Sequence, residues 1–330
     1  MNWKRAPVLV TGAGGFIGSH LSEELVRQGA RVRALVHYNS RNHWGLLEKL
    51  DADVLRRIEV VAGDISDPQC VSRLAEGREV VFHLAALIAI PYSYIAAASY
   101  VAANVTGTLN VLEACRRHKV RKLVHTSTSE AYGTARYVPI DETHPLQGQS
   151  PYSATKIGAD HLAESYFRSF GLPVAILRPF NTFGPRQSAR AVIPTIITQL
   201  IAGRPVLELG CVTPVRDFTY VADTVMGFLA AAASAKSVGE VINIGSGRGV
   251  TIAQTAQAVM RLMGRKARLR QSRARVRPER SEVMRLLCDN RKARRLLGWK
   301  PRWSLEEGLV RTIDYLTRNR SDYKAGVYNL

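Results

Sequence analysis

Three glycines, at positions 12, 15 and 18, constrain the fold of this chain more than any other feature. They lie between a short apolar run at 8–10 and an amphipathic segment at 16–28. The first permits a tight turn, the second lets the backbone approach a diphosphate, and the third lets a helix pack closely on the preceding strand. The pattern predicts a dinucleotide-binding turn in which the diphosphate meets the positive end of the helix dipole. The residues expected at the cofactor are Gly12, Gly15, Phe16, Ile17 and Gly18.

Short apolar runs alternate with helical patterns through the first 180 residues. The expected strands are 8–10, 32–36, 58–61, 80–84, 122–126 and 174–177. This alternation predicts an α/β protein with a Rossmann-type, doubly wound parallel sheet and helices on both faces. Prolines break the rhythm after Arg178. We expect residues 1–180 to form an NAD(P)-binding domain. Residues 181–330 are expected to form mainly a smaller C-terminal substrate-binding lobe, with some segments returning to the main sheet.

The end of the second expected strand bears on the choice between NAD and NADP. An acidic residue there normally holds the ribose of NAD, whereas a nearby arginine accommodates the 2′-phosphate of NADP. No carboxylate is present, and the residues available to a phosphate are Asn39, Ser40 and Arg41. This composition favours NADP, with NAD as the alternative. Further cofactor contacts are expected after the third and fourth strands, at Asp64, Ile65, Leu84, Ala85 and Ala86.

Tyr152 and Lys156 are spaced to share one face of a helix. A nearby ammonium stabilises a phenolate and lowers the pKa of a tyrosine toward the working pH. The pair therefore predicts a base that takes a proton from a hydroxyl while the same carbon gives up hydride. Both side chains are also expected beside the cofactor.

A cluster of serine and threonine at 126–129 follows the fifth expected strand and runs into Glu130. Ligands bind at the carboxyl ends of parallel strands, so we expect Ser127 and Thr128 to contact the substrate. Removal of a carbon-bound proton beside a ketone needs an additional base, which Glu130 can provide. Ser129 is placed to help protonate a leaving hydroxyl, and the alternative is that Glu130 is a solvated loop carboxylate. The predicted catalytic residues are Thr128, Ser129, Glu130, Tyr152 and Lys156.

Composition limits the classes of function. The net charge is +19, and residues 261–302 hold sixteen Lys/Arg against three acids. Because no nucleic-acid-binding motif accompanies this charge, we interpret it as a solvated basic surface around a phosphate-bearing substrate, with no nucleic-acid partner. Four cysteines without C-x-x-C spacing predict no metal site and a reducing compartment. The absence of a long apolar run or a signal-peptide pattern predicts a cytoplasmic protein with no membrane span.

Together these motifs resemble the extended short-chain dehydrogenase/reductase superfamily. The chain is similar in particular to NAD(P)-dependent nucleotide-sugar 4,6-dehydratases of the branch associated with legionaminic acid synthesis. The superfamily motifs are 11–18, 127–133 and 152–156, and the closer similarity lies in 38–40, 82–94, 137–153, 178–194 and 277–283. The resemblance covers residues 6–316.

The resemblance implies conversion of an NDP-hexose to its 4-keto-6-deoxy derivative, with UDP- or GDP-N-acetylglucosamine or GDP-mannose as substrate. Tyr152 and Lys156 would act in oxidation at C4, Glu130 would remove the C5 proton, and hydride would return to C6 after water is lost. Substrate contacts are expected at Asn181, Arg186, Val192, Arg216 and Arg277. A homodimer is also implied, through a four-helix bundle of helices 103–116 and 151–167.

Three other functions remain open from the sequence. A UDP-glucuronate decarboxylase shares the catalytic residues and needs an arginine for the C6 carboxylate, for which Arg186 and Arg190 are candidates. An NDP-sugar 4-epimerase needs Tyr152 but not Glu130. An NADP-binding protein that associates with nucleic acid through its basic lobe is the alternative outside enzymes. Where some dehydratases carry an Asp-Glu pair, this chain has Ser129 and Glu130, as do some sugar-nucleotide decarboxylases.

Overall fold

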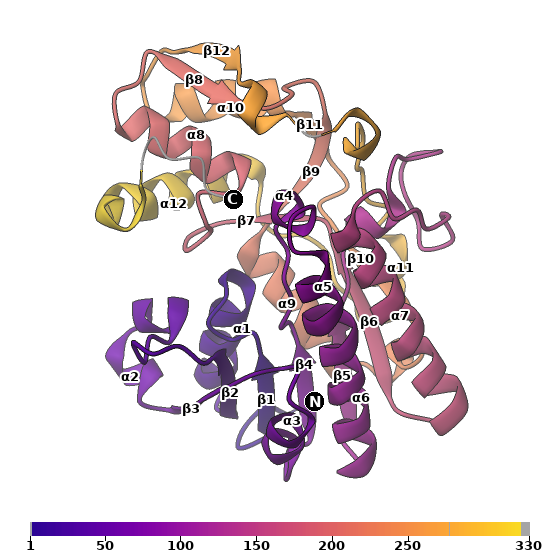
Figure 1. Ribbon diagram of the computed structural model, residues 1–330. Helices are drawn as coiled ribbons and strands as arrows, with labels where there is room; N and C mark the ends of the chain where they lie inside the picture. Colours follow the sequence, from indigo (N-terminus) through magenta and orange to yellow (C-terminus); the bar gives the residue numbers. More distant parts are fainter. Residues whose placement is uncertain (1, 277, 325–330) are drawn as a thin grey trace.

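A seven-stranded parallel sheet forms the centre of the molecule in the computed structural model, which describes residues 2–276 and 278–324. The strand order is β10-β6-β5-β4-β1-β2-β3 (Figure 1). The strands are β1 (Pro7–Thr11), β2 (Arg31–His37), β3 (Ile58–Gly63), β4 (Val80–His83), β5 (Lys122–Thr126), β6 (Val174–Pro179) and β10 (Val241–Ile244). The doubly wound α/β fold is confirmed. The strand order reverses between β1 and β4, and this is where ligands bind in such sheets.

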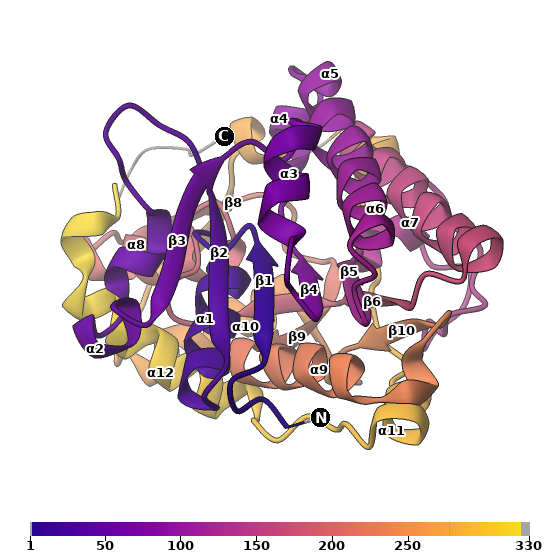
Figure 2. The ribbon, with the colours of Figure 1, turned by 90° about the horizontal axis from the view of Figure 1, so that it is seen from below.

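Helices cover both faces of the sheet, as Figure 2 shows. Alternate residues of β1 point into two different cores, because successive side chains of a strand face opposite sides. Val8 and Val10 belong to the core beneath α1 and α9, and Leu9 belongs to the core beneath α3, α6 and α7. The bounds of these helices are α1 (Phe16–Arg27), α3 (Pro68–Ala75), α6 (Gly107–Arg117), α7 (Pro151–Phe170) and α9 (Val221–Ala233). Short helices connect them at α2 (Ala52–Leu55), α4 (Ile90–Ser93) and α5 (Ala97–Tyr100).

Local sequence explains where the long helix α7 begins and ends. Ser150 and Ser153 form a reciprocal capping box at its start, with Pro151 in the first turn. Gly171 ends it in a left-handed conformation, with φ of 65°. The observed helix is three residues longer at its C-terminal end than expected from the sequence.

The second half of the chain builds smaller sheets above the main one and also contributes to the main sheet. The three-stranded sheet contains β7 (Asn181–Phe183), β9 (Val215–Tyr220) and β11 (Gly249–Thr251), and the two-stranded sheet contains β8 (Val206–Leu209) and β12 (Arg268–Gln271). The helices of this half are α8 (Val192–Ile201), α10 (Ile252–Leu262), α11 (Arg291–Leu297) and α12 (Leu305–Arg318), besides α9. Strand β10 pairs with β6, so the chain returns to the main sheet. Among the described residues, no helix is both long enough and apolar enough to span a bilayer.

The helix expected at 103–116 is interrupted in the structure. A π-helical turn, Val101–Thr106, precedes α6. Its widened geometry directs Asn104 into the interior, where the amide accepts from the backbone N–H of Leu87 at 2.8 Å. The same amide donates to the Leu87 carbonyl and to Thr155 Oγ1, at 3.0 and 3.1 Å. The turn thereby fixes the segment after β4 against α7.

A buried aspartate, Asp217 on β9, provides a test of how segments within the second half of the chain are held together. Its carboxylate accepts from the backbone N–H groups of Ser246, Gly247 and Cys288 at 2.8, 2.8 and 3.1 Å. Asp217→Ala leaves these donors without an acceptor, and we expect the free energy of unfolding to fall by about 3 kcal/mol. Urea denaturation at neutral pH measures this change.

The matched control is Asp53→Ala, which removes an exposed carboxylate paired with Arg56. We expect a change below about 0.5 kcal/mol, as is usual for surface ion pairs. Equal effects of the two substitutions would show that the Asp217 hydrogen bonds do not contribute to stability.

Candidate active site

The glycine turn brings β1, α1 and the end of β4 into direct backbone contact. A Cβ atom on Gly18 would lie 2.2 Å from the Gly12 carbonyl oxygen, and one on Gly12 would lie 2.7 Å from the backbone nitrogen of Ala85. Helix α1 follows Gly15, with Phe16 and Ile17 in its first turn. It has no side-chain cap and no acidic residue in that turn, so its N–H groups are open to a diphosphate. This cradle fits a dinucleotide cofactor.

Side chains at the ends of β1 and β4 hold the expected cofactor wall of Leu84, Ala85 and Ala86. Thr11 Oγ1 accepts from the backbone N–H groups of Leu84 and Ala85, both at 3.1 Å. The same hydroxyl lies 2.8 Å from His83 Nδ1. Burial lowers the pKa of His83 well below its ordinary value, so the ring is neutral. The wall is therefore fixed beside the glycine turn by a neutral hydrogen-bonded cluster.

The expected cofactor residues after β2 and β3 lie in exposed turns. The amide of Asn39 accepts from the backbone N–H groups of Arg41 and His43 and donates to the His43 carbonyl, so it stabilises its own loop. Ser40 and Arg41 are exposed, and Arg41 forms no ion pair with any described residue.

The turn after β3 is built around Asp64. Its carboxylate accepts from the backbone and hydroxyl of Ser66, which lowers the pKa of Asp64. Ile65, next in the chain, is half-buried and receives a hydrogen bond at its carbonyl from Asn110. Cofactor binding by the residues of both turns stays a prediction.

Tyr152 and Lys156 are both buried on the face of α7 that packs on the sheet. Lys156 Nζ donates to the carbonyl of Thr126 at 2.6 Å. Burial lowers the pKa of Lys156 to about 8, although the charge of Asp160 opposes this shift. Burial raises the pKa of the Tyr152 phenol, and a hydrogen bond with Thr128 opposes that rise. The structure thus brings the tyrosine, the lysine and the end of β5 together.

Glu130 lies in a 3-10 turn that begins directly after β5. Thr128 caps this turn, Ser129–Tyr132, by accepting from the backbone N–H of Glu130 at 3.2 Å. The half-buried carboxylate of Glu130 is close enough for its charge to raise the pKa of Tyr152. Ser129 is buried in the same turn. A carboxylate and a phenol therefore lie at one site, as two bases acting on adjacent carbons require.

Asp160 was missed by the sequence analysis, although it anchors this site. Its carboxylate accepts from Ser127 Oγ at 2.5 Å, from Arg178 Nη2 at 2.9 Å and from His125 Nε2 at 3.2 Å. These bonds, together with the Arg178 charge, lower the pKa of Asp160 to about 2 despite complete burial. The available signal was an acidic residue four positions after Lys156 on the buried face of the same helix. The hydroxyl of Ser127 is engaged here, so its expected substrate contact stays a prediction.

The expected substrate residues of the second half lie in different environments. Asn181, on β7, has a buried Oδ1 with no hydrogen-bond partner among the described residues, which suits a ligand contact. Val192 opens α8 and is half-buried. Arg216, on β9, is buried and pairs with Glu282 at 3.1 Å. Arg277 lies outside the described residues.

Arg186 is directed at α1. Its Nη2 pairs with Glu23 at 2.5 Å, and its Nε donates to His20 Nε2 at 3.2 Å. The residue is buried and has a left-handed backbone with φ of 66°. Its Nη1 has no partner among the described residues. A substrate contact by Arg186 stays a prediction, and Nη1 is the nitrogen through which it would be made. No group of three or more potential metal ligands is found in the described part of the chain.

The Rossmann-type sheet, the glycine turn and the Tyr-x-x-x-Lys helix define an extended short-chain dehydrogenase/reductase. Residues 9–312 match the family model described as GDP-mannose 4,6 dehydratase. Two curated relatives are similar over nearly their whole length. "Uncharacterized UDP-glucose epimerase YtcB" of Bacillus subtilis (strain 168) is 34% identical over 314 residues, covering 94% of this chain and 98% of the relative. A dTDP-glucose 4,6-dehydratase of Actinoplanes sp. is 33% identical, covering 95% and 98%.

A solved structure is similar over the same extent. DesIV, the dTDP-glucose 4,6-dehydratase of Streptomyces venezuelae with NAD bound, superimposes with a TM-score of 0.87 at 31% identity, covering 96% of this chain and 98% of that one. This chain belongs to the GDP-mannose 4,6-dehydratase family. Its relatives include dehydratases and epimerases of nucleotide sugars, so the family establishes an enzyme of this group without deciding between the two reactions.

Replacing Asp160 by asparagine tests the network beneath the site. The variant leaves Arg178 buried without its counter-ion, and we expect the free energy of unfolding at neutral pH to fall by about 3–5 kcal/mol. The folded-state pKa of Asp160 is lowered from 3.8 to about 2. Its stabilising contribution is therefore complete above pH 3.8 and is lost as the pH falls through 2.

The difference in the free energy of unfolding between the parent protein and Asp160→Asn should consequently become smaller in acid. Urea denaturation at neutral pH and near pH 3 measures this. The exposed Asp314→Asn, which removes the partner of Arg318, is the matched control and should change stability little at either pH. If Asp160→Asn lowers the free energy of unfolding by the same amount at both pH values, the Asp160 carboxylate is not charged in the folded protein as assigned.

Proposed function

We propose that this protein is a nucleotide-sugar 4,6-dehydratase that converts an NDP-hexose to its 4-keto-6-deoxy derivative. The proposal is carried by one observation: Thr128 caps the turn that holds Glu130 and is also hydrogen-bonded with the Tyr152 phenol, which brings the carboxylate and the phenol to one site. Two bases side by side suit a reaction that removes protons from a hydroxyl and from the neighbouring carbon. The proposed substrate is UDP- or GDP-N-acetylglucosamine or GDP-mannose, which would place the protein in the branch associated with legionaminic acid synthesis.

Tyr152 takes the proton of the C4 hydroxyl in the proposed reaction. The hydrogen bond with Thr128 favours the phenolate against the effect of burial. Lys156, one helical turn away, is proposed to supply a cation that favours it further. NAD(P), which the glycine turn of Gly12, Gly15 and Gly18 would hold, would supply the hydride acceptor for C4 and the hydride donor for C6.

Glu130 removes the C5 proton, which the neighbouring C4 ketone has made acidic. The C6 hydroxyl then leaves as water and takes the proton now held by Glu130, either directly or through the hydroxyl of Ser129. Asn181, with its unpartnered carbonyl oxygen, and Arg216 are proposed to hold the diphosphate end of the substrate.

A 4-epimerase is the second candidate, favoured by the similarity to the relative named as a UDP-glucose epimerase. That reaction uses Tyr152 and the cofactor but needs no base at C5, so Glu130 would have no role in it. A UDP-glucuronate decarboxylase also shares the catalytic residues, but it must hold a carboxylate at C6.

The deciding experiment is incubation of the purified protein with UDP-N-acetylglucosamine, GDP-N-acetylglucosamine, GDP-mannose, UDP-glucuronate and UDP-glucose. Mass spectrometry should detect loss of one water from an NDP-hexose. Loss of carbon dioxide from UDP-glucuronate would establish the decarboxylase instead. A product of unchanged mass but different sugar stereochemistry would establish the epimerase.

The proposed assembly is a homodimer through a four-helix bundle of α6 and α7 from each subunit. These helices pack side by side on one face of the sheet (Figure 2). Val101 and Leu109 expose 49% and 37% of their surface on the turn before α6 and on α6 itself. Burial of such apolar side chains favours association. Light scattering measures the mass of the purified protein in solution and so tests whether it is a dimer.

Glu130→Gln separates dehydration from the other reactions. The amide cannot take the C5 proton, so we expect the rate of water loss to fall by about 10²-fold or more. Oxidation at C4 should persist, observed as a single-turnover rise in reduced-nicotinamide absorbance. Glu76→Gln, at an exposed position outside the site, is the control and should retain full activity. Full dehydratase activity in Glu130→Gln would disprove the assigned role.

Arg41→Ala tests the proposed preference for NADP over NAD. The exposed guanidinium has no ion-pair partner among the described residues and follows β2, where the 2′ position of a bound adenosine is expected. We expect the Kd of NADP to rise about tenfold or more and that of NAD to stay unchanged. Calorimetric titration of both cofactors measures this. A variant that weakens the binding of both cofactors equally would assign Arg41 to a feature that they share, and a parent protein that binds NAD more tightly would show that NAD is preferred.

A further inference from the structure

His83 is buried at the end of β4 and has no part in the reaction proposed above. Its two ring nitrogens connect two different elements. Nδ1 lies 2.8 Å from the hydroxyl of Thr11, at the end of β1, and Nε2 lies 3.0 Å from the hydroxyl of Thr108, on α6. Because a hydroxyl can donate or accept, these distances alone do not show which nitrogen carries the proton. The hydrogen bonds of the two threonines do show it.

The Thr11 hydroxyl determines the state of Nδ1. A hydroxyl has one proton and two acceptor lone pairs. Both lone pairs of Thr11 Oγ1 are used, since it accepts from the backbone N–H groups of Leu84 and Ala85 at 3.1 Å each. Its own proton is then donated to His83, so Nδ1 is unprotonated. A proton on Nδ1 would compete with the two backbone groups for the same oxygen.

The Thr108 hydroxyl gives the same assignment from the other side of the ring. It donates its proton to the carbonyl of Asn104, four residues earlier, at 2.6 Å. It can therefore only accept from His83, so Nε2 carries the ring proton. The two threonines agree on one neutral tautomer. In this tautomer each hydroxyl and each ring nitrogen between Asn104 and Ala85 has a partner.

The charges around His83 also favour a neutral ring. Besides the two threonines, the groups that face it are His125 on β5, with 5.5 Å between ring centroids, and Lys156 on α7. Burial first, and then the charges of these two residues, lower the pKa of His83 well below its ordinary value. The buried carboxylate of Asp160 is already bonded to His125 and Arg178. A second proton on His83 would therefore have no counter-ion.

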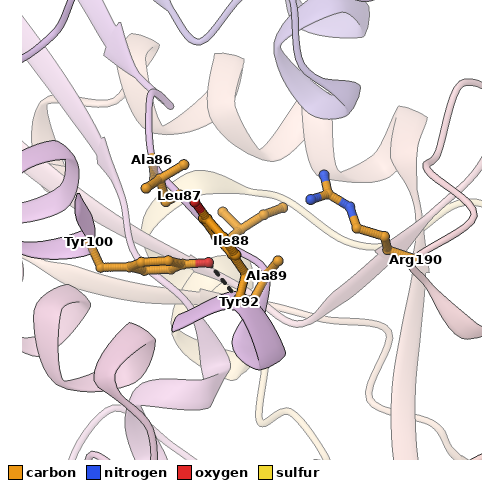
Figure 3. Close-up of a pocket in the computed structure, with 7 residues that line it drawn as sticks. All are labelled: Ala86, Leu87, Ile88, Ala89, Tyr92, Tyr100 and Arg190. Atoms are coloured by element: carbon orange, nitrogen blue, oxygen red, sulfur yellow. Dashed lines mark hydrogen bonds between the residues drawn. The ribbon is translucent and has the colours of Figure 1, made fainter. Parts of the chain in front are cut away.

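The backbone that Thr11 holds is the expected cofactor wall. The N–H of Leu84 also reaches the carbonyl of Thr11 at 3.2 Å, whereas Ala85 depends on the hydroxyl. Ala85 lies against the glycine turn, where a Cβ atom on Gly12 would be 2.7 Å from its nitrogen. From Ala86 the same segment continues along a cavity of 240 Å³ (Figure 3). A shift of Ala85 would therefore move the surface that is expected to face the cofactor.

We propose that His83 is a positioning residue for the cofactor, which acts through Thr11 on the backbone at 84–86 and does so only as the neutral Nε2–H tautomer. Thr108 selects this tautomer. The tautomer in turn leaves both lone pairs of the Thr11 hydroxyl to the backbone, so the position of α6 contributes to the shape of the cofactor site. The proposal rests on the cofactor site of the proposed function and is independent of the sugar and of the reaction.

The first test determines the tautomer in the parent protein. In a proton–nitrogen correlation spectrum of protein labelled at histidine, a ring nitrogen that carries a proton is distinguished from one that does not. The ring of His83 is assigned through its contacts with the side chains of Thr11 and Thr108. We expect its proton on Nε2 and no change between about pH 5 and 8, where an ordinary histidine titrates. A proton on Nδ1, or on both nitrogens, would overturn the proposal.

The second test compares Thr108→Val with Thr108→Ser. Valine keeps the shape and removes the acceptor, so the ring proton is free to move to Nδ1, whereas serine keeps the hydroxyl. By calorimetric titration of cofactor-free protein, we expect the Kd of the preferred nicotinamide cofactor to rise about fivefold or more in Thr108→Val and less than about twofold in Thr108→Ser. The Kd of UDP or GDP should change less than about twofold in both. Thr317→Val removes the same type of hydroxyl-to-carbonyl bond at an exposed position of α12 and should change neither Kd.

The results that would overturn the proposal are distinct. An unchanged cofactor Kd in Thr108→Val would show that the tautomer does not hold the wall. Equal weakening of cofactor and nucleoside diphosphate would show a general loss of structure, and equal effects of valine and serine would assign the change to packing. Where Thr108→Val does not fold, the tautomer of the parent protein decides. A parent protein that binds neither NAD nor NADP would refute the cofactor site itself, whereas one that binds cofactor but releases no water would refute only the dehydratase.

Discussion

The buried carboxylate of Asp160 is the interaction on which the geometry of the active site depends. It lies on α7, one turn beyond Lys156 and two turns beyond Tyr152. It is hydrogen-bonded to Arg178 on β6, to His125 on β5 and to Ser127 just after β5. A buried charge is tolerated only when its partners stay in place. Rotation or sliding of α7 on the sheet would separate it from Arg178, so the network fixes the helix that carries the phenol and the ammonium. It also keeps a negative charge close enough to Lys156 to limit the fall in its pKa.

A second set of contacts fixes the other side of the site at the point where the strand order reverses. Thr11 holds the backbone after β4, and the π-helical turn before α6 holds the same segment from the opposite direction through Asn104. The segment between them forms the expected cofactor wall and, at 86–89, one side of a cavity of 240 Å³ that Tyr92, Tyr100 and Arg190 also line. Buried polar side chains therefore set the position of the backbone that borders both.

The main sheet and the glycine turn were predictable because each depends on local sequence. The strand expected at 122–126 is found there as β5, and the turn from Gly12 to Gly18 requires glycine because other backbone atoms lie too close for a Cβ atom. The spacing of Asp160 from Lys156 was not sufficient to predict its role, because one acidic residue on a helix has the same local pattern whether it is solvated or buried beside Arg178. The π-helical turn was not predictable either. Its effect is to direct the Asn104 amide into the interior, and this contact is visible only in the folded structure.

Arg186 and Arg190 show most clearly what local sequence cannot predict. Arg186 and Arg190 lie four residues apart in one loop and were equivalent candidates for a substrate carboxylate. The left-handed backbone at Arg186 turns its side chain to Glu23, while Arg190 extends to the cavity. The different directions of the two side chains depend on Glu23, which is 163 residues from Arg186 in the chain. Only the folded structure can supply it.

Having serine at position 129 also constrains the proposed elimination. A serine hydroxyl passes a proton on but does not supply one, because its own pKa is far above the working range. The proton that the C6 hydroxyl needs in order to leave as water must then come from the group that has just taken one from C5. In the proposed elimination, the half-buried carboxylate of Glu130 would therefore serve as base in the first half and as acid in the second. The protons would then balance within the site, so one acidic residue would be sufficient where some dehydratases carry two.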